Sequence, residues 1–150
     1  MKLISALLVG VMLLVNVHAG DASDRFVAKL KLTSALTAVV AEGDFEARSI
    51  GSFSVRLYSS KDAQPGDDTT FFVAGIIQDR DGYIERVALA DFDAHPAIVV
   101  IVRCVGTGQY LSAYAFGFDE KSVRLRASVA DLPWNADAVS ALGKSVAKSK

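Results

Sequence analysis

The sequence predicts an all-β protein, an antiparallel β-sandwich of about eight strands with a short C-terminal helix. Short runs of alternating apolar and polar residues recur at regular spacing between residues 25 and 128. Gly, Pro and Asp residues separate these runs, as in tight turns. No run of strand character alternates with a long helical pattern, which excludes a βαβ fold. A closed barrel is the alternative architecture.

The first 19 residues are predicted to be a cleavable signal peptide. Lys2 precedes the apolar run LISALLVGVMLLV, and Val17 and Ala19 occupy the −3 and −1 positions of a cleavage site. The run is too short for a membrane anchor, so no membrane contact is expected after cleavage. Residues 20–150 are then predicted to form a single domain.

The charge and cysteine content restrict the function classes. Removing Lys2 with the leader changes the net charge from −1 to −2, so nucleic-acid binding is not expected. Cys104 is the only cysteine, which rules out an intrachain disulfide. An export signal without a disulfide framework indicates a bacterial periplasmic protein. Cys104 itself, within an apolar strand, is predicted to be a small buried hydrophobe.

The first half of the mature chain is expected to contain four strands, at residues 25–33, 36–41, 52–59 and 71–78. In the strand at 52–59, Phe53, Val55 and Leu57 form an apolar face opposite polar neighbours. The sequence KDAQPGDDTT at 61–70 predicts a solvated loop. The sequence DRDG at 79–82 predicts a β-hairpin to the next strand, because Asp-Gly favours tight two-residue turns.

The second half is expected to contain strands at residues 83–90, 98–102, 110–118 and 122–128. An acidic connection at 91–96 leads into the run at 98–102, which has no polar residue and is predicted to be buried on both faces. After residue 128, Asn135 is expected to cap a helix that is shortened by Gly143. The apolar face of that helix contains Val139, Leu142 and Val146.

Two pairs of carboxylates resemble calcium loops. Asp79 and Asp81, and likewise Asp91 and Asp93, stand at alternate positions, as oxygen ligands of calcium do. Each pair lacks a third oxygen ligand at the following alternate position, so ordinary turns are the preferred interpretation. A calcium-dependent binding or adhesion module is the alternative function.

An enzymatic function is not predicted, and no cofactor is expected. His95 is the only histidine of the mature chain and is predicted to be a surface loop residue. The sequence contains no zinc spacing, nucleophile elbow or phosphate-binding loop.

The loop between the strands at 98–102 and 110–118 is the candidate site. Its sequence is Gly106, Thr107, Gly108, Gln109 and Tyr110, and the glycines are expected to permit a sharp turn. A rigid hairpin of this kind would present a hydroxyl and a phenol to the groove of a partner. A plain hairpin turn without function is the alternative at this point.

The sequence resembles the bacterial periplasmic inhibitors of I-type (invertebrate) lysozyme. The resemblance rests on EGDFEARSIGSFSVRLYS at 42–59, FFVAGIIQDRDGYIERV at 71–87 and GTGQYLSAYAF at 106–116. It implies an antiparallel β-sandwich that is often a homodimer. It also implies that a Ser-Gly-any-Tyr loop enters the active-site cleft of the lysozyme and contacts its catalytic carboxyl groups.

The matching residues are Thr107, Gly108, Gln109 and Tyr110, with Gly106 and Arg103 as secondary candidates. Thr107 stands where the family usually has serine, and its extra methyl group would cost about 1–3 kcal/mol in a tightly packed cleft. Arg103 could add charge attraction to the acidic catalytic site, although a place on the sheet surface is the preferred interpretation.

Overall fold

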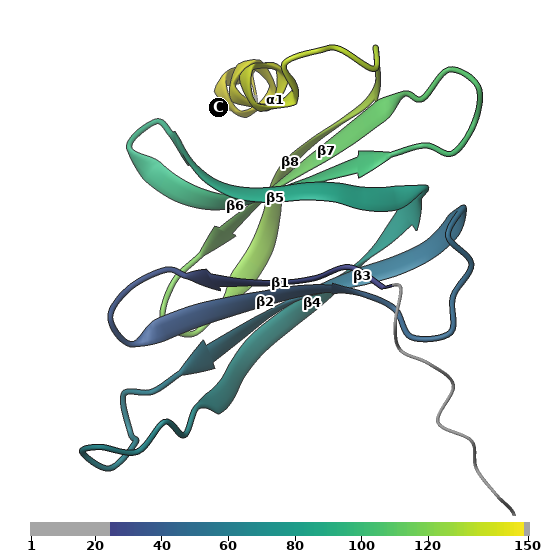
Figure 1. Cartoon of the computed structure of the whole chain (residues 1–150). Coiled ribbons are helices and arrows are strands. Elements are labelled where there is room, and N and C mark those ends of the chain that lie inside the picture. Colours follow the sequence, from purple (N-terminus) through teal and green to yellow (C-terminus); the bar gives the residue numbers. More distant parts are fainter. Residues whose placement is uncertain (1–24, 149–150) are drawn as a thin grey trace, which may run out of the picture.

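The computed structural model describes residues 25–148 as two antiparallel sheets packed face to face, with a helix on the outer face of the second (Figure 1). The first sheet consists, in spatial order, of β1 (Val27–Lys31), β2 (Leu36–Glu42), β3 (Ile50–Ser59) and β4 (Phe71–Asp81). The second consists of β5 (Tyr83–Phe92), β6 (His95–Arg103), β7 (Leu111–Phe118) and β8 (Val123–Leu132). The predicted sandwich is confirmed, and the barrel alternative is wrong.

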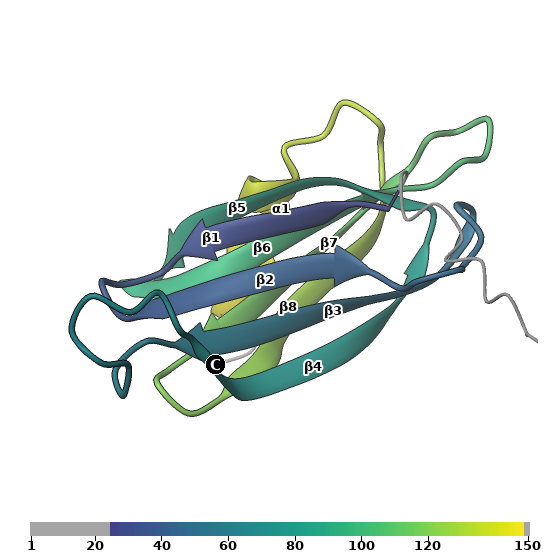
Figure 2. The same cartoon turned by 60° about the horizontal axis from the view of Figure 1, so that its bottom comes forward.

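Two consecutive meanders therefore build the sandwich, because each strand pairs with its neighbour in sequence except β4 with β5 (Figure 2). The predicted signal peptide, residues 1–19, lies outside the described residues. Among residues 25–148, no helix has the length and apolar character needed to cross a membrane.

Strand β6 is buried on both faces, as its sequence predicts, because it contributes to two hydrophobic cores. Ile98, Val100 and Val102 belong to the core between the two sheets. Val99 and Ile101 belong to a second core between the second sheet and the C-terminal helix. A strand between two apolar layers has no solvent face, which explains the unbroken apolar run.

The helix α1 (Ala138–Lys148) covers the second sheet with one apolar face. Ala138, Leu142 and Val146 are buried at intervals of four residues, as the helical repeat requires. The predicted cap at Asn135 is wrong: the Asp137 carboxylate accepts a hydrogen bond from the Ser140 amide at 3.1 Å. Asp137 therefore satisfies one of the amides left unpaired at the helix N-terminus.

The acidic connection at 91–96 is shorter than the sequence predicts. β5 continues to Phe92, which pairs with His95 at the start of β6. The turn between them consists of Asp93 and Ala94, whose φ angles are 53° and 62°. Two consecutive positive φ angles match the right-handed twist of the flanking strands, so these strands can extend to the turn.

The predicted hairpin at 79–82 is wrong, because β4 pairs with β3 and β5 pairs with β6. The chain instead crosses from the first sheet to the second at Gly82, which has a φ of 116°. Glycine permits this backbone conformation in a corner just as it does in a hairpin. The local sequence therefore identifies a sharp change of direction without distinguishing these two geometries.

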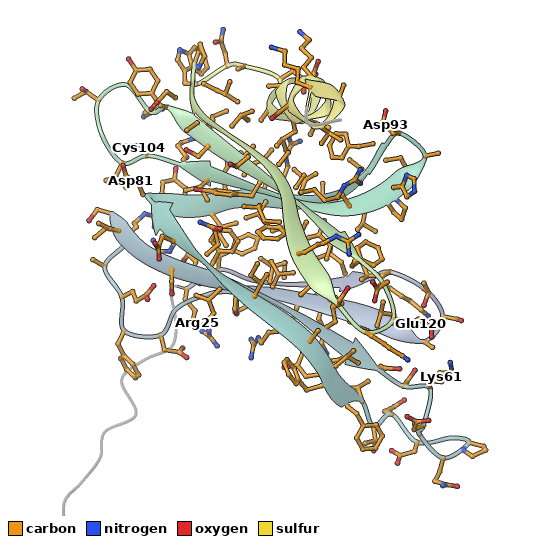
Figure 3. All side chains as sticks on the ribbon, turned by 180° about the vertical axis from the view of Figure 1, so that it is seen from behind. Arg25, Lys61, Asp81, Asp93, Cys104 and Glu120 are labelled. Carbon is orange, nitrogen blue, oxygen red and sulfur yellow. The ribbon has the colours of Figure 1, made fainter. Side chains whose placement is uncertain are left out.

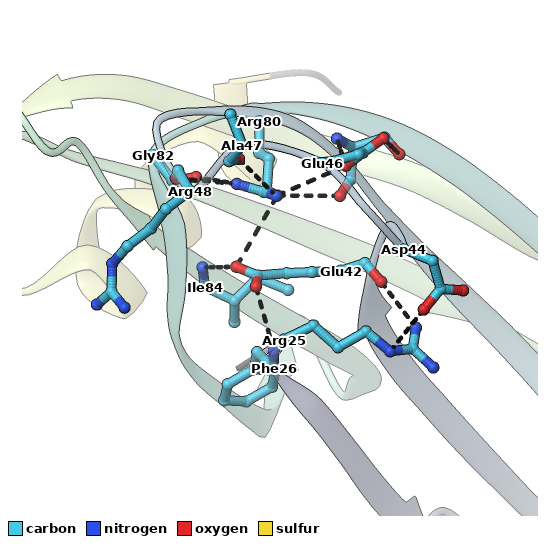
Figure 4. A network of polar contacts seen from close by, with 11 residues as sticks. Arg25, Phe26, Glu42, Asp44, Glu46, Ala47, Arg48, Arg80, Gly82 and Ile84 are labelled. Atoms are coloured by element: carbon cyan, nitrogen blue, oxygen red, sulfur yellow. Dashed lines mark hydrogen bonds and ion pairs between the residues drawn. The ribbon is translucent and has the colours of Figure 1, made fainter. Parts of the chain in front are cut away.

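A buried ionic network holds this corner in place (Figure 4). The guanidinium of Arg80 donates to the carbonyl oxygens of residues 47, 48, 52 and 82. Its Nε lies 3.8 Å from Oε1 of Glu42, and its Nη2 lies 3.5 Å from Oε2 of Glu46. Glu42 in turn accepts hydrogen bonds from the amides of Phe26 and Ile84, at 3.1 and 2.6 Å. The network therefore connects both sheets at one end of the sandwich.

Candidate functional site

The candidate site is the loop of residues 104–110, which joins β6 to β7 and extends beyond the end of the sandwich (Figures 1 and 2). Arg103 and Leu111 form the last pair of the two strands. Within the loop, the Cys104 amide donates to the Tyr110 carbonyl oxygen at 2.9 Å, and the Gln109 amide donates to the Gly106 carbonyl oxygen at 3.0 Å. The first bond closes the base of the loop, and the second defines a β-turn with Thr107 and Gly108 at its centre.

The two glycines of the loop do not serve the purpose that the sequence suggested. Gln109, with a φ of 48°, is the loop residue in the left-handed region, and neither glycine has a positive φ. Gly108 has a different role: a Cβ there would lie 2.2 Å from Cε2 of Tyr110 in its present position. The tyrosine ring therefore lies directly over Gly108, and the missing side chain makes room for it. A Cβ at Gly106 would meet only Cys104 Sγ, at 3.4 Å.

Thr107 and Tyr110 are both exposed at this loop. Tyr110 is 53% exposed although its ring rests on Gly108. Tyr110 also lies outside β7, which begins at Leu111 and not at residue 110 as predicted. The loop thus offers solvent one hydroxyl and one phenol, separated by a residue without a side chain and by Gln109.

Arg103 holds the loop from its base. Its Nη1 donates to the Gln109 carbonyl oxygen at 3.2 Å, and its Nη2 forms an ion pair with Glu85 Oε1 at 2.7 Å. The hydrogen bond to the Glu85 carboxylate raises the pKa of Arg103, so the guanidinium stays charged. The Arg103 side chain is only 15% exposed. Arg103 is therefore a positioning residue and not a free cation on the sheet surface.

The corner at Gly82 supports the same base. A Cβ on Gly82 would lie 2.0 Å from the Arg103 carbonyl oxygen and 2.8 Å from Cys104 Cα. The corner is fixed by two hydrogen bonds, from the Gly82 amide to the Ser49 carbonyl oxygen at 2.8 Å and from Arg80 to the Gly82 carbonyl oxygen. The backbone where the loop leaves β6 therefore rests against the anchored corner that joins the two sheets.

Cys104 differs from its prediction, because it follows β6 and is only partly buried. Its Sγ accepts a hydrogen bond from the Gly106 amide at 3.3 Å. The thiol thereby stabilises the first turn of the loop.

The structure does not bring the two Asp-x-Asp segments together. Asp79 and Asp81 lie within strand β4 and not in a turn. Figure 3 shows Asp81 near Cys104 at one end of the molecule and Asp93 at the other. Among residues 25–148, no group of three or more His, Cys, Asp or Glu side chains is suited to a metal ion. His95 is the first residue of β6, exposed beside the turn at 93–94, rather than a residue of a long loop.

A groove of about 430 Å³ opens beside the base of the loop. It is lined by residues of β5, of the ends of β6 and β7, of the connection to the helix and of the first position of α1, namely Glu85, Arg86, Ile101, Arg103, Leu111, Trp134, Asn135, Ala136 and Ala138. Sequence reasoning missed Trp134, because its exposure is a property of the fold and the sequence shows only that it is the single tryptophan. It also missed the pairing of Glu85 with Arg103, for which strand pattern gives no signal.

Comparisons with known proteins identify the family and the fold of the chain. The profile of the family described as periplasmic lysozyme inhibitor of I-type lysozyme (PliI) matches residues 24–146. The crystal structure of PliI from Aeromonas hydrophila is 37% identical, with a TM-score of 0.69 over 78% of this chain and 98% of that chain. The same inhibitor in complex with Meretrix lusoria lysozyme is also 37% identical, with a TM-score of 0.67 over 78% of this chain and 94% of that chain. No curated protein matches the sequence.

Proposed function

The chain belongs to the family of periplasmic inhibitors of I-type lysozyme, and we propose that it inhibits by inserting its β6–β7 loop into the lysozyme active-site cleft. The protein is an inhibitor and not an enzyme, its partner is an I-type lysozyme, and its location is the periplasm. A homodimer stays a prediction.

The observation that carries the proposed mechanism is the exposure of Thr107 and Tyr110 on a loop with fixed supports. The Arg103 side chain holds the backbone at Gln109, and the corner at Gly82 lies against the backbone at Arg103 and Cys104. The Tyr110 ring is seated on Gly108. A loop that is already ordered loses less conformational entropy on binding. Its two hydroxyl groups are therefore presented in a defined arrangement before the lysozyme arrives.

The chemistry of the loop suits a cleft that contains catalytic carboxyl groups. Residues 104–110 include no Asp or Glu, and the nearby Glu85 is paired with Arg103. The loop itself therefore carries no negative charge into an acidic cleft. There the Thr107 hydroxyl and the Tyr110 phenol would donate hydrogen bonds to the acid and the nucleophile of the enzyme. The loop would occupy the space that the polysaccharide needs, and no bond would be broken.

The test is titration of an I-type lysozyme with the mature protein and with Tyr110→Ala, measuring lysis of a bacterial cell suspension. Loss of an interface tyrosine at the centre of a contact costs about 2 kcal/mol or more, so inhibition should weaken at least thirtyfold. The melting temperature should stay unchanged because the ring is mostly in solvent. Phe71→Ala is the matched control, since Phe71 is 49% exposed at the opposite end of β4 from the corner. Equal inhibition by the wild type and Tyr110→Ala would show that the loop is not the site.

Thr107→Ser tests the residue at which this chain departs from the family pattern. The serine keeps the hydroxyl and removes the methyl group, so inhibition should be preserved or improved. A large loss would show that the methyl group makes a favourable contact with the lysozyme.

A further inference from the structure

The groove beside the loop shares its wall with the candidate site. Arg103 and Leu111, which close the strand pair below the loop, also line the groove. Another wall of the groove comes from the connection between β8 and α1, which contains Trp134. In Figure 2 this connection, in yellow, and the β6–β7 loop, in green, rise from the same side of the molecule. A partner protein that receives the loop must therefore come close to the groove.

Trp134 is the most conspicuous side chain of this wall. It is the only tryptophan of the protein, and it is 62% exposed. Its connection is ordered by a hydrogen bond from the Ala136 amide to the Pro133 carbonyl oxygen at 2.9 Å and by the helix cap at Asp137. A large aromatic group kept in solvent on an ordered segment gains burial when a partner covers it. Tryptophan is also among the residues that contribute most to protein interfaces.

The charge of the groove suits the same partner. Arg86 is exposed there, and the Arg103 charge is balanced by Glu85. The groove wall therefore has an excess of one positive charge. The rim of a lysozyme cleft lies close to its catalytic carboxyl groups, so this excess favours the approach of the enzyme.

The loop alone is small for a stable protein complex. It contains the seven residues 104–110, whereas a stable complex buries about 800 Å² on each partner, from about 20–30 residues. Additional contact surface is required, and the groove is continuous with the loop.

We propose that the groove with Trp134 is a second docking surface for the same lysozyme and receives the rim of its active-site cleft. This inference rests on the proposed function of the loop. Tyr110 enters the cleft, while Trp134 and Arg86 contact the enzyme surface beside it. The groove then adds affinity and selects among lysozymes, because the rim varies more freely than the catalytic carboxyl groups.

The single tryptophan permits a direct test. The protein is labelled with 5-fluorotryptophan, which gives one fluorine resonance, and is titrated with unlabelled I-type lysozyme. The resonance should shift or broaden until the stoichiometric point. In the lysis assay, Trp134→Ala should inhibit roughly tenfold more weakly with an unchanged melting temperature. Phe72→Ala, which removes an aromatic ring that is 61% exposed on the first sheet, should inhibit like the wild type.

The outcomes separate this inference from the proposed function. If Tyr110→Ala abolishes inhibition while the resonance does not move and Trp134→Ala inhibits fully, the loop is the site and the groove is not. If Tyr110→Ala inhibits fully, the proposed function itself fails. A shift of the resonance on adding soluble oligosaccharides of peptidoglycan, with no lysozyme present, would overturn the inference in favour of a sugar-binding groove.

Discussion

Substituting Gly108 with alanine should weaken inhibition without lowering the stability of the protein. A Cβ at this position would lie 2.2 Å from Cε2, 2.8 Å from Cδ2 and 2.9 Å from Cζ of Tyr110. Carbon atoms in ordinary contact are about 3.5–4.0 Å apart, so the ring must retreat by more than ~1 Å. Tyr110 is exposed, which allows the ring to move without disturbing the core. The phenol would then leave the position in which it is preorganised.

The substitution therefore has two separate effects, one on the stability of the protein and one on inhibition. Alanine restricts the unfolded chain more than glycine does, which stabilises a protein by about 0.4–1 kcal/mol where the backbone angles are compatible. Gly108 has no positive φ, so its angles do not exclude alanine. A misplaced phenol would lose the hydrogen bond to a charged carboxylate that the proposed mechanism assigns to it, which is worth about 1.5–3 kcal/mol. Inhibition should therefore weaken by about tenfold to a hundredfold, while the melting temperature stays equal or rises.

Gly106→Ala is the matched control in the same loop. Its Cβ would meet only Cys104 Sγ, at 3.4 Å, so the tyrosine ring would not move. Inhibition constants for I-type lysozyme and thermal melts of both variants should be measured together. Gly106→Ala should stay within about threefold of the wild type. If Gly108→Ala inhibits as well as Gly106→Ala, the position of the ring over Gly108 is not the one used in binding, and the reasoning is refuted.

Three further substitutions test the supports of the loop. Arg103→Met removes the donor to the Gln109 carbonyl oxygen, so inhibition should weaken about fivefold and amide exchange in the loop should accelerate; unchanged exchange would contradict its positioning role. Arg80→Met leaves the Glu42 carboxylate buried without its cation and should lower the free energy of unfolding in urea by about 3–5 kcal/mol; a loss below ~1 kcal/mol would contradict the network. Hydrogen bonds from the Ser52 amide and hydroxyl, with the Arg80 charge, hold the pKa of Glu46 below its ordinary value of 4.5. The ionised Glu46 carboxylate contributes fully to the free energy of unfolding above pH 4.5, and this contribution is lost as the pH falls through the lowered pKa. Glu46→Gln should therefore flatten the decline of stability below pH 4.5. An identical decline in both proteins would assign the acid sensitivity to other groups.

The sequence predicts most strands because apolar content and its alternation are local properties of a segment. The run at 98–102 is apolar on both sides, and the structure places it between two cores. The division into two sheets is not local in this way. A corner and a hairpin both require a sharp turn, and Asp81-Gly82 satisfies either one. What decides between them is the pairing of β4 with β3 and of β5 with β6, which depends on distant segments.

The alternation of inward and outward residues along β2 and β4 indicates a buried ion pair, which the turn propensity of residues 79–82 obscures. Glu42 continues the inward-facing series of Leu36, Ala38 and Val40, and it is buried. Arg80 likewise continues the inward series of β4, since residues 76 and 78 pair with the buried Val55 and Phe53. Opposite charges at inward positions of two strands in one sheet predict a buried ion pair, because an unpaired buried charge is costly. This pattern argues against a solvated hairpin at 79–82.

The exposed tip of the candidate site follows from sequence, but its rigidity does not. Thr107 and Tyr110 lie between two apolar strands, and the structure leaves both exposed. The supports come from residues far apart in the chain: Glu85 contacts Arg103 across 18 positions. No local pattern encodes such a contact.

The position of the loop in the sheet explains why these supports are available. β6 and β7 are the two central strands of the second sheet, in the order β5-β6-β7-β8, so neighbours flank the loop on both sides. On one side, β5 supplies Glu85, and the corner before it supplies the close contact of Gly82 with Arg103. On the other side, β8 leads to the connection that contains Trp134. A loop at the edge of a sheet would have a neighbour on one side only. The central position therefore gives the protein both a preordered loop and a surface that adjoins it, which is the arrangement that the two proposals require.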